Sequence, residues 1–214
     1  MKKKIAICGA GGLGREVLSL LKALPEWEVI GFYDDGKSKG DEIGGVVVLG
    51  AIADLNQVSV DTHVVIAIGS PIIKERIAKQ LVQNQHLKPA TIIHPSVIIQ
   101  DSESVSIGKG CVLGAGVILT TQIVVGDHVL LNLNGTVGHD VVIGNYTSVM
   151  PGVNIAGEVK LGEGVMIGAG ANVLNGLRVG AFCKIGAGAV VTKNVEAGVT
   201  VVGVPARKMN QKYA

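Results

Sequence analysis

The sequence predicts an α/β domain over residues 1–93, followed by a parallel β-helix with a C-terminal tail over residues 94–214. Two patterns predict this division: an apolar run followed by closely spaced glycines opens the chain, and aliphatic residues recur at every sixth position in its second half. Composition agrees, because 31 of the 214 residues are glycine and only 3% are aromatic, while 48% are hydrophobic. A core of this composition must use small aliphatic side chains at regular turns.

The charge of the chain gives no reason to expect nucleic acid or membrane partners. The net charge of +2 is small, and the basic residues form no stripe beyond residues 2–4, which we expect to be a solvated terminus. No unbroken apolar run of about 18 residues follows, so we expect a soluble, cytoplasmic protein. Cys8, Cys111 and Cys183 are an odd number at wide spacing, which favours reduced, buried thiols over a disulfide framework.

The α/β domain opens with a glycine-rich turn. An apolar strand over residues 5–8 leads into the pattern Gly9-x-Gly11-x-x-Gly14 and then into an amphipathic helix. Glycines at this spacing let the backbone approach a pyrophosphate that lies at the helix N-terminus. The pattern therefore predicts a nucleotide-binding strand-turn-helix, and a glycine turn that binds nothing is the structural alternative.

The length of the first domain limits the kind of nucleotide. A second strand ends in Asp34 and Asp35, about 20 residues past the glycines, where a carboxylate would meet a ribose hydroxyl. A further strand over residues 62–69 and a helix from about Ile72 follow, and the repeat is established by Ile107. Only one mononucleotide-sized half fits in this space. A single nucleotide, such as the uridine diphosphate of an activated sugar, therefore suits it better than a dinucleotide.

The second half of the chain repeats every six residues. Fifteen successive positions at this spacing are aliphatic, and glycine follows nine of them. A fixed period of six predicts a parallel β-helix, in which each hexapeptide buries its apolar face only by stacking on others. Three hexapeptides make a coil of 18 residues, so the fifteen predict five coils that are roughly 24 Å tall at the usual strand spacing. The positions are Ile107, Leu113, Leu119, Val125, Leu131, Val137, Ile143, Val149, Ile155, Leu161, Ile167, Val173, Val179, Ile185 and Val191.

This repeat resembles that of the hexapeptide-repeat acyltransferases, whose coils wind left-handed. Sugar acyltransferases, serine acetyltransferases and gamma-type carbonic anhydrases share it, so the repeat alone is specific for fold rather than function. The ending VVGVPARKM, residues 201–209, resembles the acetyl-CoA-dependent branch. The resemblance implies a Rossmann-like half-domain followed by a left-handed parallel β-helix.

A narrower resemblance covers essentially the whole chain. The half-domain, the link IIHPSV over residues 92–97 and the hexapeptides together resemble bacterial sugar acetyltransferases of the UDP-4-amino-sugar N-acetyltransferase and sialic acid O-acetyltransferase type. This resemblance implies that three turns hold a UDP-sugar. Leu13 departs from the group, because several relatives carry a histidine there that touches the substrate. The implied contacts are Gly11, Gly12, Leu13, Asp34, Asp35 and Gly69.

His139 and Asp140 are a titratable pair in an otherwise apolar stretch. His139 lies two residues after Val137, at a turn rather than in the inward row, and Asp140 can hold one imidazole nitrogen and raise the basicity of the other. Gly157 lies 18 residues further, so its backbone is expected one coil along, beside the histidine. The resemblance implies a catalytic histidine in this hexapeptide; a histidine that is satisfied at a corner is the structural alternative.

These residues predict direct acetyl transfer. We expect His139 to deprotonate the sugar amine as it attacks the thioester of acetyl-CoA, with the Gly157 N–H stabilising the oxyanion and no covalent acetyl-enzyme. The resemblance implies that acetyl-CoA lies in a groove between the prisms of a homotrimer, and three flat faces suit such packing. The implied donor contacts are Ser148, Gly157, Ala169 and Ala187.

Several alternatives stay open at this point. His128, preceded by Asp127, is the rival histidine and is interpreted as structural. A gamma-type zinc site needs three histidines, and only two lie within the β-helix, so no metal is expected. The leading hypothesis is N-acetylation of a UDP-4-amino-dideoxy sugar for bacterial surface glycan synthesis. O-acetylation of a sialic acid or related sugar would use the same base and donor, and a non-catalytic nucleotide-binding scaffold is the third hypothesis.

Overall fold

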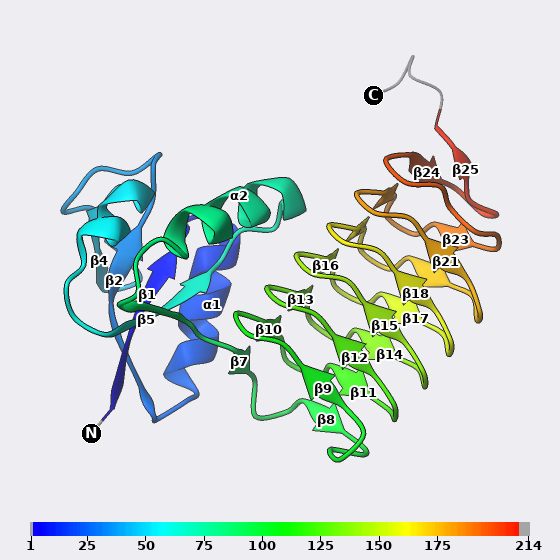
Figure 1. The fold of residues 1–214 in the computed structure, drawn as a ribbon, viewed down its shortest axis with the longest axis horizontal. Coiled ribbons are helices and arrows are strands. Elements are labelled where there is room, and N and C mark those ends of the chain that lie inside the picture. The colour runs from blue at the N-terminus through cyan, green and yellow to red at the C-terminus, as the bar shows by residue number, and fades with distance from the viewer. Residues whose placement is uncertain (1, 210–214) are drawn as a thin grey trace.

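The computed structural model describes residues 2–209 and divides them into two parts (Figure 1). An α/β domain packs beside the first coils of a parallel β-helix, and the later coils run away from it toward the C-terminal end. The last strand of the α/β domain ends at Pro89 and the first strand of the β-helix begins at Ile92. In the described part of the chain, no helix is long and apolar enough to cross a membrane.

The α/β domain is built on a six-stranded sheet in the order β3-β4-β2-β1-β5-β6. All neighbouring strands are parallel except the short antiparallel pair of β3 and β4. Helix α1 (Gly12–Lys22) covers one face, while α2 (Pro71–Leu81) and the 3₁₀ helix η1 (Ile52–Gln57) cover the other. The strands are β1 Lys3–Cys8, β2 Trp27–Tyr33, β3 Glu42–Ile43, β4 Val46–Gly50, β5 Thr62–Ile66 and β6 Leu87–Pro89.

Strand β1 marks the point at which the order of the sheet reverses. The chain passes from β1 through α1 to β2 on one side, and the later strand β5 pairs with β1 on the other side. Ligands of open α/β sheets bind at such a switch point, beyond the carboxyl ends of the strands. The glycine turn after β1 and Gly69 after β5 both lie there, so the predicted single nucleotide-sized half is present.

The second part is a three-sided β-helix of very short strands. We call its sides the β7 face, the β8 face and the β9 face, after the first strand of each. The β7 face holds β7 Ile92–Ile93, β10 Val112–Leu113, β13 Leu130–Leu131, β16 Ser148–Val149, β19 Met166–Ile167, β22 Lys184–Ile185, β24 Thr200–Val202 and β25 Arg207–Lys208. The β8 face holds β8 Ile98–Ile99, β11 Ile118–Leu119, β14 Thr136–Val137, β17 Asn154–Ile155, β20 Asn172–Val173 and β23 Val190–Val191. The β9 face holds β9 Ser106–Ile107, β12 Val124–Val125, β15 Val142–Ile143, β18 Lys160–Leu161 and β21 Arg178–Val179.

The β-helix is longer than the predicted five coils. It begins at β7, whose Ile92 pairs with Val112, so the first coil has 20 residues rather than 18. Two extra residues between β8 and β9 break the period of six, which hides this coil in the sequence. The last coil is shortened, since Lys184 pairs with Thr200. Between these ends the 18-residue register holds throughout.

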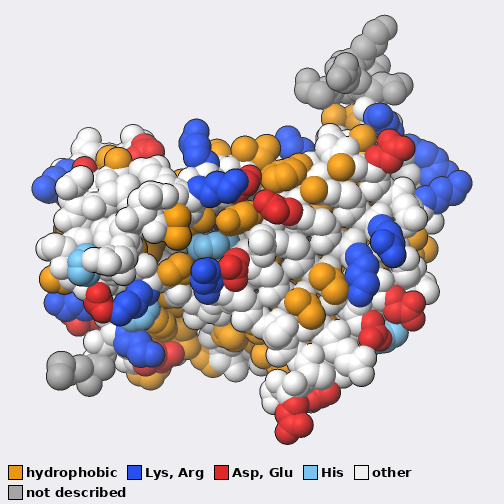
Figure 2. Space-filling view, viewed as in Figure 1, with side chains coloured by type: hydrophobic (Ala, Val, Ile, Leu, Met, Phe, Trp, Pro, Cys, Tyr) orange, Lys and Arg blue, Asp and Glu red, His pale blue; other side chains and the backbone are white. Residues whose placement is uncertain are grey.

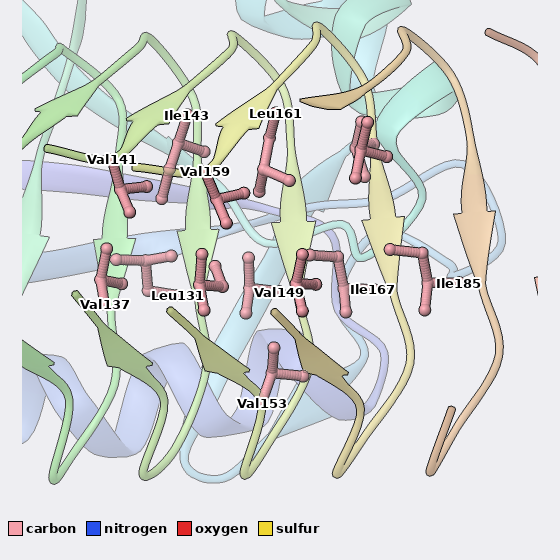
Figure 3. Close-up of a cluster of buried hydrophobic side chains, with 14 of the residues drawn as sticks. Leu131, Val137, Val141, Ile143, Val149, Val153, Val159, Leu161, Ile167 and Ile185 are labelled. Carbon is pink, nitrogen blue, oxygen red and sulfur yellow. The ribbon is translucent and has the colours of Figure 1, made fainter. Parts of the chain in front are cut away.

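The repeat fills the prism with aliphatic side chains. Leu131, Val137 and Ile143 point inward from the three faces of one coil, and Val149 begins the next coil below Leu131 (Figure 3). Of the fifteen aliphatic positions in the repeat, fourteen are buried in a single cluster and Ile107 packs against it. The prediction of a hexapeptide core is confirmed.

The corners between faces force residues into the left-handed region of the backbone. Non-glycine residues with positive φ recur there, including His128 at 55° and Asp140 at 59°. Only a few per cent of non-glycine residues adopt this conformation, with Asn, Asp and His enriched. The corner therefore fixes the direction of the backbone where polar side chains leave the prism.

The α/β domain packs against the outer side of the β7 face. Ile92, Val112 and Leu130, which point outward from the first coils, share one apolar cluster with α1, and Met150 packs against it. The only side-chain hydrogen bonds recorded between the α/β domain and the β-helix within residues 2–209 come from Lys74 of α2. The β8 and β9 faces carry no part of this contact.

Candidate active site

The glycine turn presents open backbone at the switch point. A methyl group built on Gly11 or Gly12 would meet no atom within 4 Å, whereas one on Gly14 would overlap the carbonyl of Gly9. Gly9 itself has a φ of 105°, a conformation that favours glycine. Gly9 and Gly14 are thus needed for the turn, while Gly11 and Gly12 leave space for a ligand at the start of α1.

The two aspartates after β2 hold neighbouring backbone rather than standing free. Asp34 accepts hydrogen bonds from the N–H of Ala10 at 2.7 Å and of Gly36 at 2.8 Å. Asp35 accepts one from the N–H of Ile52 at 2.9 Å. Hydrogen bonds to a carboxylate are roughly twice as strong as neutral ones. Asp34 therefore ties the glycine turn to the end of β2.

The remaining predicted substrate contacts surround the same turn. Leu13 lines a cavity of about 260 Å³ between α1 and the first coils. Gly69 follows β5, and a methyl group built on it would lie 3.7 Å from the Met150 side chain. The nearby thiol of Cys8 is buried, and this burial, with the charges of Asp35 and Asp34, raises its pKa to about 12. Cys8 stays protonated and is no nucleophile.

His139 and Asp140 form the predicted pair at the corner between the β8 and β9 faces. The imidazole Nδ1 lies 2.8 Å from Oδ2 of Asp140, and the histidine side chain is 56% exposed. With Nδ1–H held by the carboxylate, the lone pair of Nε2 is free to accept a proton. This pair has the arrangement that a general base requires.

Gly157 lies against the imidazole, one coil further along. A methyl group built on Gly157 would overlap Nε2 of His139, and the carbonyl of His139 accepts the N–H of Glu158 at 2.7 Å. Within residues 2–209, no backbone acceptor takes the Gly157 N–H. A basic nitrogen and an unused amide donor therefore lie side by side, which suits proton removal and oxyanion stabilisation at one carbonyl.

A polar hollow of about 480 Å³ lies beside the pair. Asp140, Glu158, Lys160, Gly176 and Arg178 line it. The ammonium group of Lys160 also donates to the backbone carbonyl of Asp140 at 3.0 Å, which braces the corner. Lys160 was not among the predicted site residues, although its position 20 residues after Asp140 in an unbroken 18-residue register would have placed it there.

The four residues expected to contact acetyl-CoA do not come together within one chain. Ala169 and Ala187 are exposed and stacked at the corner between the β7 and β8 faces, while Gly157 lies at the next corner, across the β8 face. Ser148 is fully buried beneath the α/β domain and accepts a hydrogen bond from Lys74 at 2.8 Å. The expectation for Ser148 is corrected, because a docked domain covers it.

Lys74 is the residue that sequence reasoning missed most clearly. Its side chain is 2% exposed, and it also donates to the carbonyl of Thr147 at 3.3 Å. Desolvation lowers its pKa to about 7. The signal was present, because Lys74, Ile77, Ala78 and Leu81 follow the spacing of a buried helix face.

Metal chemistry has no obvious place in the described region. Across residues 2–209, no group of three or more histidine, cysteine, aspartate or glutamate side chains is arranged to hold an ion. His128, the other histidine of the β-helix, lies at the corner between the β9 and β7 faces and not beside His139.

Known protein families match both parts of the chain. Residues 4–81 match the model of the PglD N-terminal domain. Residues 140–175 and 158–193 match the bacterial transferase hexapeptide model of six repeats, and residues 96–121 match the hexapeptide repeat of succinyl-transferase.

Individual relatives are sugar N-acetyltransferases. The GDP-perosamine N-acetyltransferase of Escherichia coli is 33% identical over 151 residues, which are 68% of this chain and 66% of that protein. The UDP-N-acetylbacillosamine N-acetyltransferase of Bacillus subtilis (strain 168) is 32% identical over 116 residues, 53% of this chain and 52% of that protein. The alignments thus span between half and two thirds of these relatives.

A solved structure matches over its full length. The acetyltransferase domain of PglB from Neisseria gonorrhoeae, in complex with acetyl coenzyme A, has a TM-score of 0.90 and 32% identity, and the match covers 98% of this chain and 100% of that one. Both the half-domain and the β-helix are included in that match. The chain therefore belongs to the hexapeptide-repeat sugar N-acetyltransferases of the PglD type.

Proposed function

We propose that the protein transfers the acetyl group of acetyl-CoA to the amino group of a nucleotide-activated 4-amino-dideoxy sugar. The observation that carries this proposal is the His139 corner, where Nδ1 is held by Asp140 and Nε2 lies against the unused amide of Gly157. The relatives act on a GDP-sugar and a UDP-sugar, and the matched PglB domain binds acetyl coenzyme A. The scaffold hypothesis gives no reason for this pairing.

The proposed reaction is one direct transfer. Nε2 of His139 takes a proton from the sugar amine as its nitrogen attacks the thioester carbonyl, and the Gly157 N–H donates to the developing oxyanion. The tetrahedral intermediate then expels the thiolate of coenzyme A, which takes the proton back from His139. Asp140 stabilises the imidazolium between these two proton transfers.

The nucleotide part of the substrate is proposed to lie at the glycine turn, with Gly11 and Gly12 against the phosphates and Gly69 across the switch point. Leu13, Asp34 and Asp35 complete this set. Support comes from the open space before Gly11 and Gly12 at the first turn of α1, where backbone N–H groups favour anions. Whether the base is uracil or guanine is left to the assay below.

We propose a trimer whose active site is shared between copies. The α/β domain covers the β7 face, whereas His139 lies at the opposite corner of the prism, so a sugar held at the glycine turn meets His139 of a neighbouring copy. The β8 face supports this packing because its outward side chains are uncharged and joined in a ladder. Thr136 donates to Asn154 at 2.7 Å, and Asn154 donates to Asn172 at 3.0 Å.

Light scattering is expected to give three times the chain mass of 22.0 kDa at micromolar concentration. A trimer would bring the Ala169 and Ala187 corner of one copy toward the Gly157 corner of the next and so complete a donor groove. A monomer would contradict both the trimer and the shared site.

Release of free thiol from acetyl-CoA tests the activity. We expect turnover with UDP- or GDP-linked 4-amino-4,6-dideoxy sugars and none with the corresponding 4-hydroxy sugars. A panel pairing each nucleotide with each sugar separates the choice of base from the choice of sugar. Turnover with sialic acid and not with amino sugars would overturn N-acetylation in favour of O-acetylation, and no turnover with any acceptor would favour the scaffold.

Replacing Asp34 with alanine is expected to raise KM for the nucleotide sugar by about 10-fold or more, because two charge-assisted hydrogen bonds to the glycine turn are lost. Acetyl-CoA binding should be unchanged, since the turn lies outside the proposed donor groove. Asp41→Ala, which removes an exposed hydrogen bond to Ser38, is the matched control. Equal losses for both ligands would count against separate sites.

A further inference from the structure

A second cavity, of about 360 Å³, lies between α2, strands β5 and β6, and the first coils of the β-helix. Figure 2 shows histidine, basic and acidic side chains beside hydrophobic ones where α2 meets these coils. No residue assigned above to the sugar, the donor or the chemistry lines it. We call it the interdomain cavity. Its lining from the α/β domain is mostly apolar (Val64, Ile66, Ala78, Leu81, Val82, Leu87 and Pro89), and the β-helix contributes Lys109, Asp127, His128 and Tyr146.

His128 is held rigidly in the wall of the interdomain cavity. It occupies a corner with a φ of 55°, and its N–H donates to the carbonyl of Lys109 at 2.8 Å. Its ring stacks on Tyr146 with centroids 5.7 Å apart and planes 12° apart. The ring also covers Gly110 so closely that a methyl group there would overlap Nδ1. Only 8% of the residue is exposed.

The hydrogen-bonding state of the His128 ring follows from this packing. Burial lowers its pKa to about 4, so the ring is neutral near pH 7 and carries one proton. Nδ1 is enclosed and has no partner among residues 2–209. A proton on Nδ1 would leave a buried N–H unsatisfied, at a cost of about 1–3 kcal/mol. The proton therefore lies on Nε2, the ring nitrogen that is not enclosed, as a donor that no described residue uses.

The mouth of the interdomain cavity favours an anion. The side chains of Lys79 and Lys109 are 68% and 63% exposed, and both line the cavity. Asp127 is the single carboxylate of the lining, and it lies 3.9 Å from Lys109. The lining thus offers two cations, one carboxylate and a neutral N–H donor around an apolar interior.

We propose that the interdomain cavity binds a small carboxylate with an apolar body. The carboxylate accepts the Nε2–H of His128 and faces Lys109, while the apolar body lies against α2 and the neighbouring strands. The size falls within the range of cavities that hold small ligands, which are mainly apolar with a few placed polar groups. Because both parts of the chain form its walls, the bound carboxylate also braces the α/β domain on the first coils.

Calorimetric titration of the full chain with octanoate and with indole-3-acetate tests the proposal. We expect saturable binding of at least one of the two. The uncharged counterparts, 1-octanol and indole-3-ethanol, should bind about 10-fold more weakly or worse, because they lack the charge-assisted hydrogen bond. In protein labelled with ¹⁵N-histidine, the carboxylate should shift the ring signals of His128 and leave those of His139 unchanged.

Two substitutions locate the site. His128→Phe keeps the ring and its stacking but removes the donor, and it should weaken carboxylate binding about 10-fold. Lys109→Met should weaken it about 3-fold, and Lys184→Met, an exposed lysine on a distant coil, should have no effect. No saturation at millimolar concentration, displacement by coenzyme A, or full affinity in the Lys109→Met variant together with an unmoved His128 signal would each overturn the proposal. The last two results stand even if His128→Phe does not fold.

Discussion

Replacing His139 with alanine is expected to lower kcat by about 10²–10⁴-fold, the usual contribution of a general base, while acetyl-CoA still binds. The histidine side chain is 56% exposed and packs only over Gly157 and beside Asp140, so its loss should leave the fold intact. Thiol release at saturating substrate and the melting temperature measure the two effects. The substrate amine is itself largely protonated near neutrality, so the variant should recover part of its rate as the pH rises.

A matched control exists within the chain. His86 is also an exposed histidine beside a carboxylate, with Nδ1 3.3 Å from Asp61, but it lies in the α/β domain. His86→Ala should keep its full kcat. Asp140→Asn should give an intermediate loss, because the base remains but its tautomer is no longer enforced. A near-normal kcat in His139→Ala at neutral pH would rule out the assigned base.

Replacing Lys74 with methionine is expected to remove a pH dependence from the stability of the protein. The pKa of Lys74 is about 7 in the folded state against 10.5 for an ordinary lysine, and burial is the main cause. Between these values the unfolded chain binds more protons, so the free energy of unfolding of the parent protein rises with pH. The full difference corresponds to about 5 kcal/mol, of which roughly 1.5–2 kcal/mol is gained between pH 7 and 8.5.

Urea unfolding at several pH values from 6 to 8.5 checks this expectation. The upper limit matters because burial also raises the pKa of Cys111 to about 11, and this thiol gives the opposite slope above pH 9. Lys22→Met, at the exposed end of α1, is the control and should keep the slope of the parent protein. An equal slope in Lys74→Met and the parent would show that Lys74 remains charged in the folded state.

The β-helix and the glycine turn could be read from the sequence because both depend on local or periodic features. Aliphatic residues at every sixth position describe an inward row directly, and Gly9 and Gly14 are required by contacts within one turn. The His139 corner was accessible for the same reason, since an unbroken register of 18 residues places Gly157 beside it. The first coil escaped notice because two extra residues interrupt that register between β8 and β9.

What only the tertiary structure decided is how the two parts of the chain meet. Lys74 and Ser148 are 74 positions apart, and neither has a local reason to be buried; the docking of α2 on the β7 face encloses both. The same docking removes Ser148 from the donor groove, encloses Nδ1 of His128 and forms the interdomain cavity. The repeat fixes which side chains point outward from the prism, but the energy of covering them depends on surfaces distant in sequence, and a period of six carries no information about those surfaces.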